Sequence, residues 1–288
     1  MTTNSSNENQ EQKIAILIIT TSNKRSDWNN IKDSYLYNMT LKTFLLTYNK
    51  EHKYKFYIGI DANDRIFDNI KEQEEITRFS KAFHNIEFEF IVYDNNKVPK
   101  GHCTIMWNIL FQKAYIDNYD YFYQCGDDII FKTHGWINDS IEILKRHNNI
   151  GLTGPINNNN RILTQSFVSR KHMKIFGWYF PEEIKNWCCD DWYNMVYSPS
   201  YLYPLHNHYA INNGGEPRYN INNDPNFTGN NQVIFSNNIN RLRSITNNLA
   251  NKHKQLIENY IKTEKVIKTE KVIKTEKVIK TEKVINTK

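Results

Sequence analysis

The sequence predicts an α/β fold in which helices cover both faces of a central sheet. An apolar run over residues 13–22, ending in small hydroxyl residues, is typical of a strand buried on both faces. Strand and helix patterns then alternate as far as residue 150, which is the order expected of an α/β sheet. Polar clusters follow these strands at their carboxyl ends, where ligands bind in such sheets.

Each predicted element has its own residue pattern. The strands combine β-branched and aromatic residues, and the helices space their apolar residues three and four positions apart. The predicted strands are residues 13–22, 55–60, 86–93 and an aromatic run from residue 119 that ends at the turn with Gly126, after which the apolar run resumes at 129–131, with shorter candidates at 151–155 and 163–169. The predicted helices cover residues 28–48, 66–83 and 105–114, a segment beginning at Gly135-Trp136, and residues 238–260.

The stretch over residues 119–131 carries the strongest chemical signal. An aromatic strand pattern leads to Gly126, which permits a sharp turn, and two adjacent acids, Asp127 and Asp128, follow it. Two carboxylates at a strand end are costly unless a cation lies between them. A divalent metal with oxygen ligands, completed by a substrate phosphate, is the usual solution. A solvated Asp-Asp turn is the structural alternative.

Composition narrows the function classes. The net charge is +6, but residues 261–288 contain nine Lys and four Glu, so the other 260 residues carry about +1 and predict no nucleic-acid surface. The four cysteines lack C-x-x-C spacing, which favours reduced thiols over a zinc site. Residues 1–12 lack a signal-peptide pattern, and no apolar run reaches the roughly 18 residues of a membrane span. We therefore expect a cytoplasmic protein (in the host cytoplasm or the virion, if the chain is viral) without a transmembrane segment.

The end of the chain repeats Ile-Lys-Thr-Glu-Lys-Val four times over residues 261–284. A six-residue period matches neither the helical period nor strand alternation, so the Val-Ile pairs would rotate around a helix without forming a stripe. We interpret this segment as a low-complexity tail, either extended or a fraying helix. A strip for self-association is the alternative.

Together these landmarks resemble a glycosyltransferase of the GT-A fold. The resemblance lies in the strand ending Ile19-Thr20-Thr21, the strand-end Asp61, the Asp-x-Asp position filled by Gly126-Asp127-Asp128-Ile129, and the downstream Asp190-Asp191-Trp192. More narrowly, residues 126–131, 135–136, 164–168, 176–177 and 186–192 resemble uncharacterised glycosyltransferase-like proteins of giant viruses and protists. The resemblance covers about residues 13 to 220, and two adjacent acids stand where the family has a spaced pair.

The resemblance implies a single domain with a GT-A-like mixed central sheet flanked by helices, followed by the low-complexity tail. The implied divisions are a disordered arm (1–12), a catalytic domain (13–237) with a nucleotide-sugar half (13–150) and an acceptor half (151–237), a C-terminal helix (238–260) and the repeat tail (261–288).

It also implies roles for the residues of the nucleotide site. Thr20, Thr21 and Asp61 would contact the base and ribose of a UDP- or GDP-linked sugar, although Asp61 is equally well read as a strand-end turn residue. Asp127 would face the sugar or ribose and assist Asp128, which would hold Mn²⁺ or Mg²⁺ against the diphosphate.

Residues further along the chain would complete the site. Asp190 or Asp191 would be the general base for the hydroxyl of a glycan or protein acceptor, with the other acid anchoring a loop. His206 or His208 would supply a third metal ligand, unless both are surface residues. Candidates to pair with the diphosphate, or alternatively to remain solvated, are Lys97, Lys100 and Arg170.

Two other functions stay open at this point. A catalytically inactive sugar-nucleotide or glycan-binding module would share the same fold and site. A sugar nucleotidyltransferase would share the layout and the metal, but it would carry a Gly-rich phosphate loop after the first strand, and residues 20–25 contain no glycine. Gly-Asp-Asp also occurs in RNA polymerases, for which this chain is too short and its body insufficiently basic.

Overall fold

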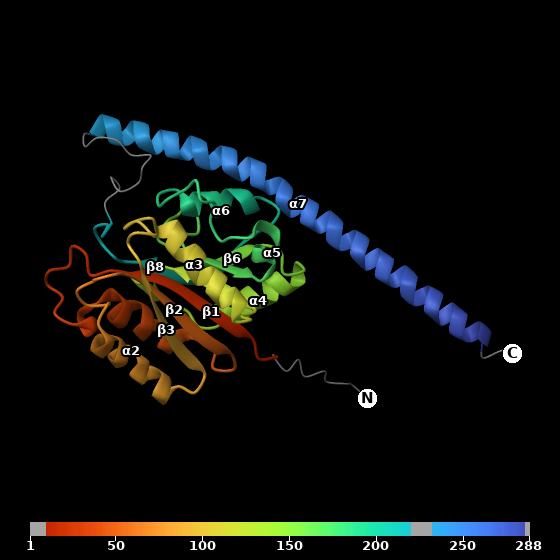
Figure 1. The fold of residues 1–288 in the computed structure, drawn as a ribbon, viewed down its shortest axis with the longest axis horizontal. Coiled ribbons are helices and arrows are strands. Elements are labelled where there is room, and N and C mark those ends of the chain that lie inside the picture. The colour runs from red at the N-terminus through yellow and green to blue at the C-terminus, as the bar shows by residue number, and fades with distance from the viewer. Residues whose placement is uncertain (1–9, 220–231, 286–288) are drawn as a thin grey trace.

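The computed structural model describes residues 10–219 and 232–285, and its centre is a mixed eight-stranded sheet (Figure 1). The strands are β1 (Lys13–Thr20), β2 (Lys53–Asp61), β3 (Ile86–Tyr93), β4 (Tyr121–Cys125), β5 (Ile129–Phe131), β6 (Leu152–Asn157), β7 (Ser166–Ser169) and β8 (Leu202–Asn212). Their order across the sheet is β3-β2-β1-β4-β7-β6-β8-β5. The predicted α/β class with a mixed sheet flanked by helices is therefore confirmed.

Helices lie on both faces of this sheet. The α-helices are α1 (Lys42–Thr47), α2 (Ile70–Ala82), α3 (Cys103–Ile116), α4 (Trp136–Arg146), α5 (Lys171–Phe176), α6 (Cys189–Tyr197) and α7 (Gln232–Ile285). The continuous helix predicted over residues 28–48 is wrong, because this segment divides into the 3₁₀ helix η1 (Ile31–Asp33), the π-helix η2 (Leu36–Leu41) and α1.

Threonine side chains from η2 and α1 accept hydrogen bonds from the backbone of β5 at the edge of the sheet. The backbone N–H of Ile129 donates to the Thr40 hydroxyl at 2.9 Å, and that of Phe131 donates to the Thr43 hydroxyl at 3.1 Å. Two amide groups of β5 are thereby satisfied by side chains of η2 and α1, which a buried strand requires. No periodicity in the sequence indicates such contacts between segments almost 90 residues apart.

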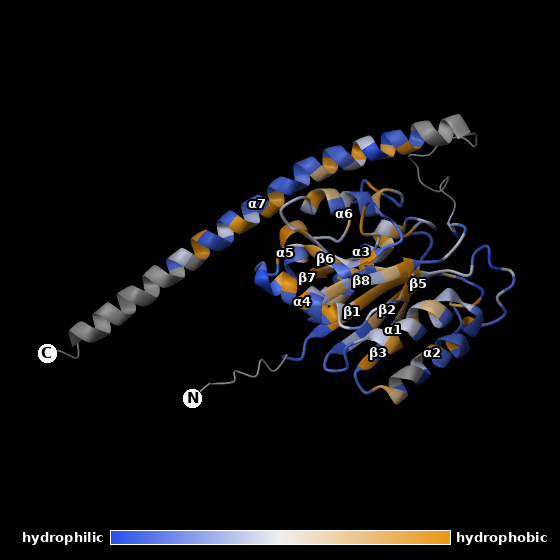
Figure 2. Cartoon of the chain, turned by 180° about the vertical axis from the view of Figure 1, so that it is seen from behind, coloured by the Kyte–Doolittle hydropathy of each residue, from blue (hydrophilic) through white to orange (hydrophobic). Residues whose placement is uncertain are grey.

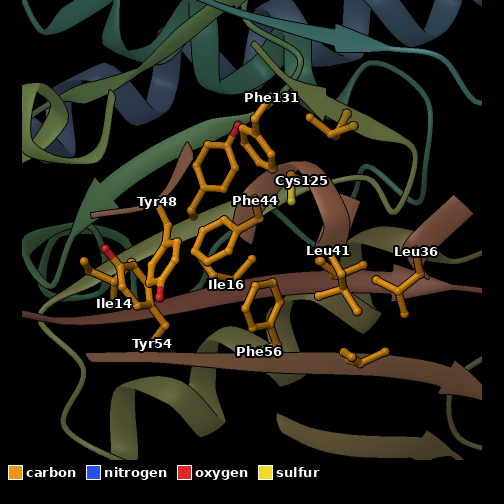
Figure 3. Packing of buried hydrophobic residues seen from close by; sticks show 14 of the residues in the cluster. Ile14, Ile16, Leu36, Leu41, Phe44, Tyr48, Tyr54, Phe56, Cys125 and Phe131 are labelled. Carbon is orange, nitrogen blue, oxygen red and sulfur yellow. The ribbon is translucent and has the colours of Figure 1, made fainter. Parts of the chain in front are cut away.

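The side chains of β1 alternate between two hydrophobic cores. Ile14, Ile16 and Ile18 face one core, whose aromatic packing is drawn in Figure 3, and Ala15 and Leu17 face the other. The first core is covered by α1, α2 and α4, and the second by α3, α5, α6 and α7. Figure 2 shows the resulting apolar centre beneath helices with polar outer faces. The sheet therefore holds its carboxyl-end loops on a rigid base.

The strand order reverses beside β1. β1, β2 and β3 are parallel and run outward in one direction, whereas β4 pairs in parallel with the opposite side of β1. The connections that leave the carboxyl ends of β1 and β4 consequently diverge and open a crevice, the usual ligand position in an open α/β sheet. Thr20 ends β1, and Gly126, Asp127 and Asp128 follow β4.

Helix α7 is one continuous helix of 54 residues that includes both the segment predicted as a helix and most of the repeat. Its contacts with the domain come from a stripe that includes Leu242, Ala250, His253 and Ile257, all at least nine-tenths buried. The C-terminal part extends away from the domain in Figure 1. In the first three repeats Glu stands four positions before a Lys of the next repeat, a spacing that supports an exposed helix. None of the helices in residues 10–219 and 232–285 combines the length and apolarity needed to span a membrane.

Candidate functional site

A cavity of about 230 Å³ lies at the carboxyl ends of β1 and β4. We call it the strand-end cavity. Its wall includes Thr20, Thr21, Asp127, Asp128, Arg218 and Tyr219. The first four come from the two diverging strand ends, and the last two come from a segment that follows β8. The structure therefore brings together the acids of the Asp-Asp motif and the hydroxyl residues that end the first strand, as the sequence predicts.

Asp127 is fully buried and is neutralised by Arg218. The Arg218 guanidinium donates from both Nη1 and Nη2 to the two Asp127 carboxylate oxygens, and the Thr20 hydroxyl donates to Asp127 Oδ2 at 2.5 Å. Burial lowers the pKa of Arg218, but the charge and hydrogen bonds of Asp127 outweigh it and raise that pKa overall. Asp127 therefore fastens Arg218 beside β1 in this structure.

Asp128 is the carboxylate that remains available to a ligand. It lines the strand-end cavity, is partly exposed, and forms no ion pair with any residue in the described parts of the chain. Burial, followed by the negative charge of Asp127, raises the pKa of Asp128 to about 6. A Cβ atom at Gly126 or Gly214 would overlap this carboxylate, so the absence of two side chains creates its space.

The segment over residues 213–219 crosses the strand-end cavity and is fastened to the loop after β1. The Arg25 guanidinium donates to the carbonyl oxygens of Gly214 and Glu216, both at 2.9 Å, and Asn23 donates to the carbonyl oxygen of Arg218 at 2.5 Å. The ring of Tyr35 lies 5.3 Å from the Arg25 guanidinium carbon and 5.7 Å from that of Arg218. Sequence reasoning gave this segment no role.

Two acids after β2 have different positions. Asp61 is buried and accepts a hydrogen bond from the Tyr219 hydroxyl at 2.7 Å, and burial raises its pKa. Asp64 accepts from the Thr21 hydroxyl at 2.9 Å and from the Ser22 backbone N–H at 2.7 Å. Burial raises the pKa of Asp64, but its hydrogen bonds outweigh burial and lower it overall. Asp64 therefore shapes the loop after β1, whereas Asp61 lies beside the segment that crosses the cavity.

A second cavity of about 250 Å³ adjoins the first. The two cavities share the wall residues Trp107, Gly126, Asn186 and Trp187. We call the second one the amide-lined cavity, because its wall includes Gln124, Gln165, Asn186 and Asn212.

Asp190 lines the amide-lined cavity from the first turn of α6, whereas its neighbour Asp191 lines neither cavity. Burial, followed by the charge of Asp191, raises the pKa of Asp190 to about 6. The helix begins after Cys188, which adopts a left-handed conformation with φ of 67°. The structure thus separates two adjacent acids that the sequence leaves equivalent.

Neither histidine lies at the strand-end cavity, which corrects the expectation of a third metal ligand. β8 pairs antiparallel with β5, and Asn212 lies opposite Ile129, next to the Asp-Asp turn. His208 and His206 precede Asn212 in β8 and therefore lie further from that turn. His208 is buried with its ring nitrogens 2.7 Å from Asp139 and 3.1 Å from Thr133. His206 lines a separate cavity together with residues such as Asn157 and Arg161.

The predicted diphosphate-binding cations also lie outside the strand-end cavity. Lys97 is exposed and its ammonium nitrogen is 3.9 Å from Asp94. Lys100 is exposed but lies close enough to Asp61 to lower the pKa of that carboxyl group. Arg170 donates to the backbone carbonyls of Tyr115 and Tyr119 and lies at the amino end of β4, opposite the cavity, which corrects its expected role. Arg218 is the cation that the structure places in the cavity wall.

The donor set of the strand-end cavity fits a divalent metal shared with a ligand. No group of three or more His, Cys, Asp or Glu residues in the described ranges forms a closed protein cage. Mg²⁺ is commonly bound by one or two carboxylates, with waters and substrate phosphates filling its other positions. Asp128 supplies such a carboxylate. Asp127 would become a second metal ligand only if its ion pair with Arg218 were broken.

No protein-family model and no curated protein sequence matches the chain. Among solved structures, S. aureus TarS residues 1–349 is similar at 13% identity and a TM-score of 0.46, covering 68% of this chain and 60% of that one. The same fragment in complex with UDP-GlcNAc is similar at 14% identity and a TM-score of 0.48, covering 72% of this chain and 60% of that one. The chain thus matches about 60% of the length of these TarS fragments. A likeness at this level leaves the function to be argued from the site itself.

Proposed function

We propose that the chain is a metal-dependent glycosyltransferase that moves a sugar from a UDP- or GDP-linked donor to a hydroxyl group of a glycan or protein acceptor. The observation that carries this proposal is the pair of adjoining cavities, each with one carboxylate of raised pKa. Asp128 lines the strand-end cavity and Asp190 lines the amide-lined cavity. Carboxyl groups with strongly shifted pKa values in a cavity are typical of functional sites.

The strand-end cavity suits the nucleoside diphosphate. Asp128 would hold Mn²⁺ or Mg²⁺, which when bound would offset the charge that develops on the leaving diphosphate. The Arg218 guanidinium has five N–H donors, and the hydrogen bonds to Asp127 and to the Thr21 carbonyl use three of them. The remaining two, on Nε and Nη2, would be the donors for a phosphate oxygen. Tyr219, which lines this cavity, would face the ribose, with Asp61 holding its hydroxyl group through a hydrogen bond.

The amide-lined cavity suits the acceptor side of the reaction. With a pKa of about 6, Asp190 is ionised at neutral pH and is still basic enough to accept a proton in the transition state. As the acceptor oxygen bonds to the anomeric carbon, its proton would pass to the Asp190 carboxylate. The bond from that carbon to the diphosphate oxygen breaks, and the leaving group departs with the electron pair. This assignment corresponds to inversion at the anomeric carbon.

Calorimetric titration of UDP and GDP, with and without Mn²⁺, tests the nucleotide site directly. We expect one nucleotide to bind the wild-type protein in a manganese-dependent way and to lose at least tenfold in affinity in Asp128→Asn. Asp191→Asn is the matched control, because that carboxyl group lines neither cavity. Absence of manganese-dependent binding to either nucleotide contradicts the proposal. Binding without turnover of any donor would support the inactive module instead.

A further inference from the structure

We infer that a third cavity binds an oxyanion, either a phosphate or a carboxylate group, through the side chains of Arg161 and His206. We call it the arginine cavity. Its volume is about 230 Å³, and its wall comes from the end of β6, the loop that follows it, α6 and β8. The oxyanion has two possible sources, an acceptor that carries a negative charge and a free anion such as phosphate. The first source rests on the proposed transferase function, and the second does not.

The arginine cavity has two basic side chains and no acidic one among its described lining residues. Arg161 is exposed, and its guanidinium forms no ion pair or hydrogen bond with any residue in the ranges 10–219 and 232–285. The other arginines of residues 10–219 all have such a contact, namely Arg25, Arg65, Arg78, Arg146, Arg170 and Arg218. His206 is also exposed and has no hydrogen-bond partner in the described part of the chain. The cavity therefore offers N–H donors that none of the described residues uses.

Asparagine side chains fix the loop that carries Arg161. Asn157 accepts a hydrogen bond from the backbone N–H of Asn159 at 2.7 Å, and Asn159 accepts one from that of Arg161 at 3.0 Å. The side chain of Asn158 exchanges two hydrogen bonds, of 2.9 and 3.0 Å, with the backbone of Asn212 on β8. Bonds of this kind hold a turn in one conformation. The backbone at Arg161 is therefore fixed before a ligand binds, which lowers the entropy cost of binding.

The arginine cavity and the amide-lined cavity lie on two sides of the same segments. Leu163 and Asn194 line the arginine cavity, and their chain neighbours Thr164 and Tyr193 line the amide-lined cavity. The side chain of Asn194 exchanges hydrogen bonds of 3.1 and 2.7 Å with the backbone of Leu163. It also donates to the carbonyl oxygen of Asp190 at 2.8 Å. The loop with Arg161 is thereby tied to the helical turn that carries the proposed base.

Arg161 also lies within electrostatic reach of that base. Burial raises the pKa of Asp190 to about 6, and the positive charge of Arg161 opposes this rise. An acceptor with its hydroxyl group at Asp190 would place a neighbouring negative group beside Arg161. The described lining of the amide-lined cavity includes no basic side chain to pair with such a group. Selectivity for an acidic acceptor would therefore come from Arg161.

The chemistry of the lining defines the ligand. The planar guanidinium of Arg161 presents paired N–H donors that match two oxygens of a carboxylate or a phosphate. Leu202, Pro204 and His206 alternate along β8 and line the same cavity, so the imidazole stands at one end of an apolar strand face. A small organic anion with some apolar surface fits this lining. A metal ion does not, because the described lining provides no carboxylate to bind it.

The test uses the full chain and Arg161→Gln, which removes the charge but keeps a polar side chain. Arg161→Lys keeps the charge and loses the planar fork. Arg243→Gln is the matched control, because Arg243 is also exposed and without a partner in the described ranges, but lines none of the three cavities.

Two sets of probes distinguish the sources of the oxyanion. Calorimetry measures inorganic phosphate in the absence of Mn²⁺, so that no metal draws the phosphate to Asp128. Saturation-transfer NMR compares methyl glucuronide with methyl glucoside, which differ by one carboxylate group, with and without the nucleotide.

If the cavity serves an acidic acceptor, the glucuronide binds at least tenfold more tightly than the glucoside, and Arg161→Gln removes this preference without changing nucleotide affinity. If it serves a free anion, phosphate binds the wild type, neither glycoside binds, and Arg161→Gln weakens phosphate binding at least tenfold. In both cases Arg161→Lys lies between the wild type and Arg161→Gln, and Arg243→Gln matches the wild type.

The inference is overturned if neither phosphate nor the glucuronide binds the wild-type protein. It is also overturned if Arg161→Gln and Arg243→Gln bind these probes equally well. A failure of nucleotide binding alone would instead count against the proposed function, since the phosphate titration reports on the arginine cavity without any nucleotide.

Discussion

Arg218 and Asp127, 91 residues apart in the chain, form a buried ion pair with two hydrogen bonds beside the strand-end cavity. The arginine belongs to the segment that follows β8, and the aspartate belongs to the turn after β4. The pair holds these two elements together. It therefore fixes the position of Gly214 relative to Asp128 and that of Tyr219 relative to Asp61. Asp127, one of the two acids that the motif suggests as metal ligands, therefore holds the 213–219 segment in place through Arg218.

We predict that Arg218→Ala lowers the free energy of unfolding by about 3 to 5 kcal/mol, because it leaves the Asp127 carboxylate buried without its cation. Urea denaturation at neutral pH measures this change. Arg146→Ala is the comparison, since the Arg146–Glu142 pair is exposed and should contribute less than about 1 kcal/mol. Equal losses in the two variants would show that the buried pair has no special role.

A second prediction concerns the space beside Asp128. In Gly214→Ala the new Cβ atom would overlap the Asp128 carboxylate and lie 2.9 Å from the Asp128 Cβ atom, so both this side chain and the turn that carries it have to shift. Manganese-dependent nucleotide affinity should then fall about tenfold. Gly177→Ala serves as the comparison: a Cβ atom there meets nothing within 4 Å, but the backbone has φ of 80°, so this variant should lose some stability and still bind the nucleotide as the wild type does. If both variants bind the nucleotide as the wild type does, the position of the Asp128 carboxylate is not critical.

The raised pKa of Asp190 predicts a defined pH dependence. Transfer activity should rise as pH increases through about 6, where the carboxyl group loses its proton, and Asp190→Asn should abolish this activity at every pH. Its pKa is about 6 in the folded chain against 3.8 ordinarily, so protonation favours the folded state. The contribution of Asp190 to stability is thus complete below about pH 4 and lost as pH rises through 6.

Unfolding free energies measured between pH 4 and 7 isolate this contribution. The wild-type protein should lose more stability than Asp190→Asn as pH rises across that interval. Asp191→Asn should remain active, because Asp191 lines neither cavity, and its activity should rise at a lower pH than in the wild type, because the charge of Asp191 helps to raise the pKa of Asp190. An Asp191→Asn variant that is inactive, beside an active Asp190→Asn variant, would reverse the assignment of the base.

Helix α7 should stabilise the domain through its buried stripe and not through the repeat. Ile257 is 1% exposed, so Ile257→Ala should cost about 2 to 5 kcal/mol of unfolding free energy by removing packed methyl groups. Val266, in the first repeat, is 57% exposed, and Val266→Ala should change stability by less than about 0.5 kcal/mol. Thermal denaturation of the two variants provides the comparison, and similar melting temperatures would mean that α7 is not part of the cooperative unit.

Local patterns were sufficient for most of the first half of the fold, apart from residues 28–48. The apolar run of β1, the alternation around β2 and β3 and the apolar spacing of α3 all depend on residues within one element, and the structure has each of them. Strand β8 and helices α5 and α6 were not assigned from the sequence. Trp192 of α6 packs against rings of both α5 and α7, so the aromatic pattern reflects several neighbours and not a single helical face.

The site residues that end or follow strands could be predicted from the sequence. Those that reach the site through long-range contacts could not. Thr20, Thr21, Asp61, Asp127 and Asp128 are the residues that end or follow predicted strands. The segment over residues 213–219 was missed, although its Gly-Gly pair and adjacent Arg-Tyr are visible in the sequence. Only the pairing of β8 with β5 shows that this segment, and not the two histidines, reaches Asp128.

The most direct test of the account is turnover of a panel of UDP- and GDP-sugars by the wild type, Asp128→Asn and Asp190→Asn, with and without Mn²⁺. We predict slow manganese-dependent hydrolysis of one donor by the wild-type protein and at least a hundredfold loss in Asp128→Asn, since both charge stabilisation and diphosphate binding would be impaired. Hydrolysis of a donor that proceeds equally well in Asp128→Asn, or in the absence of any divalent ion, would contradict the assignment of Asp128 as the metal-binding residue of a glycosyltransferase.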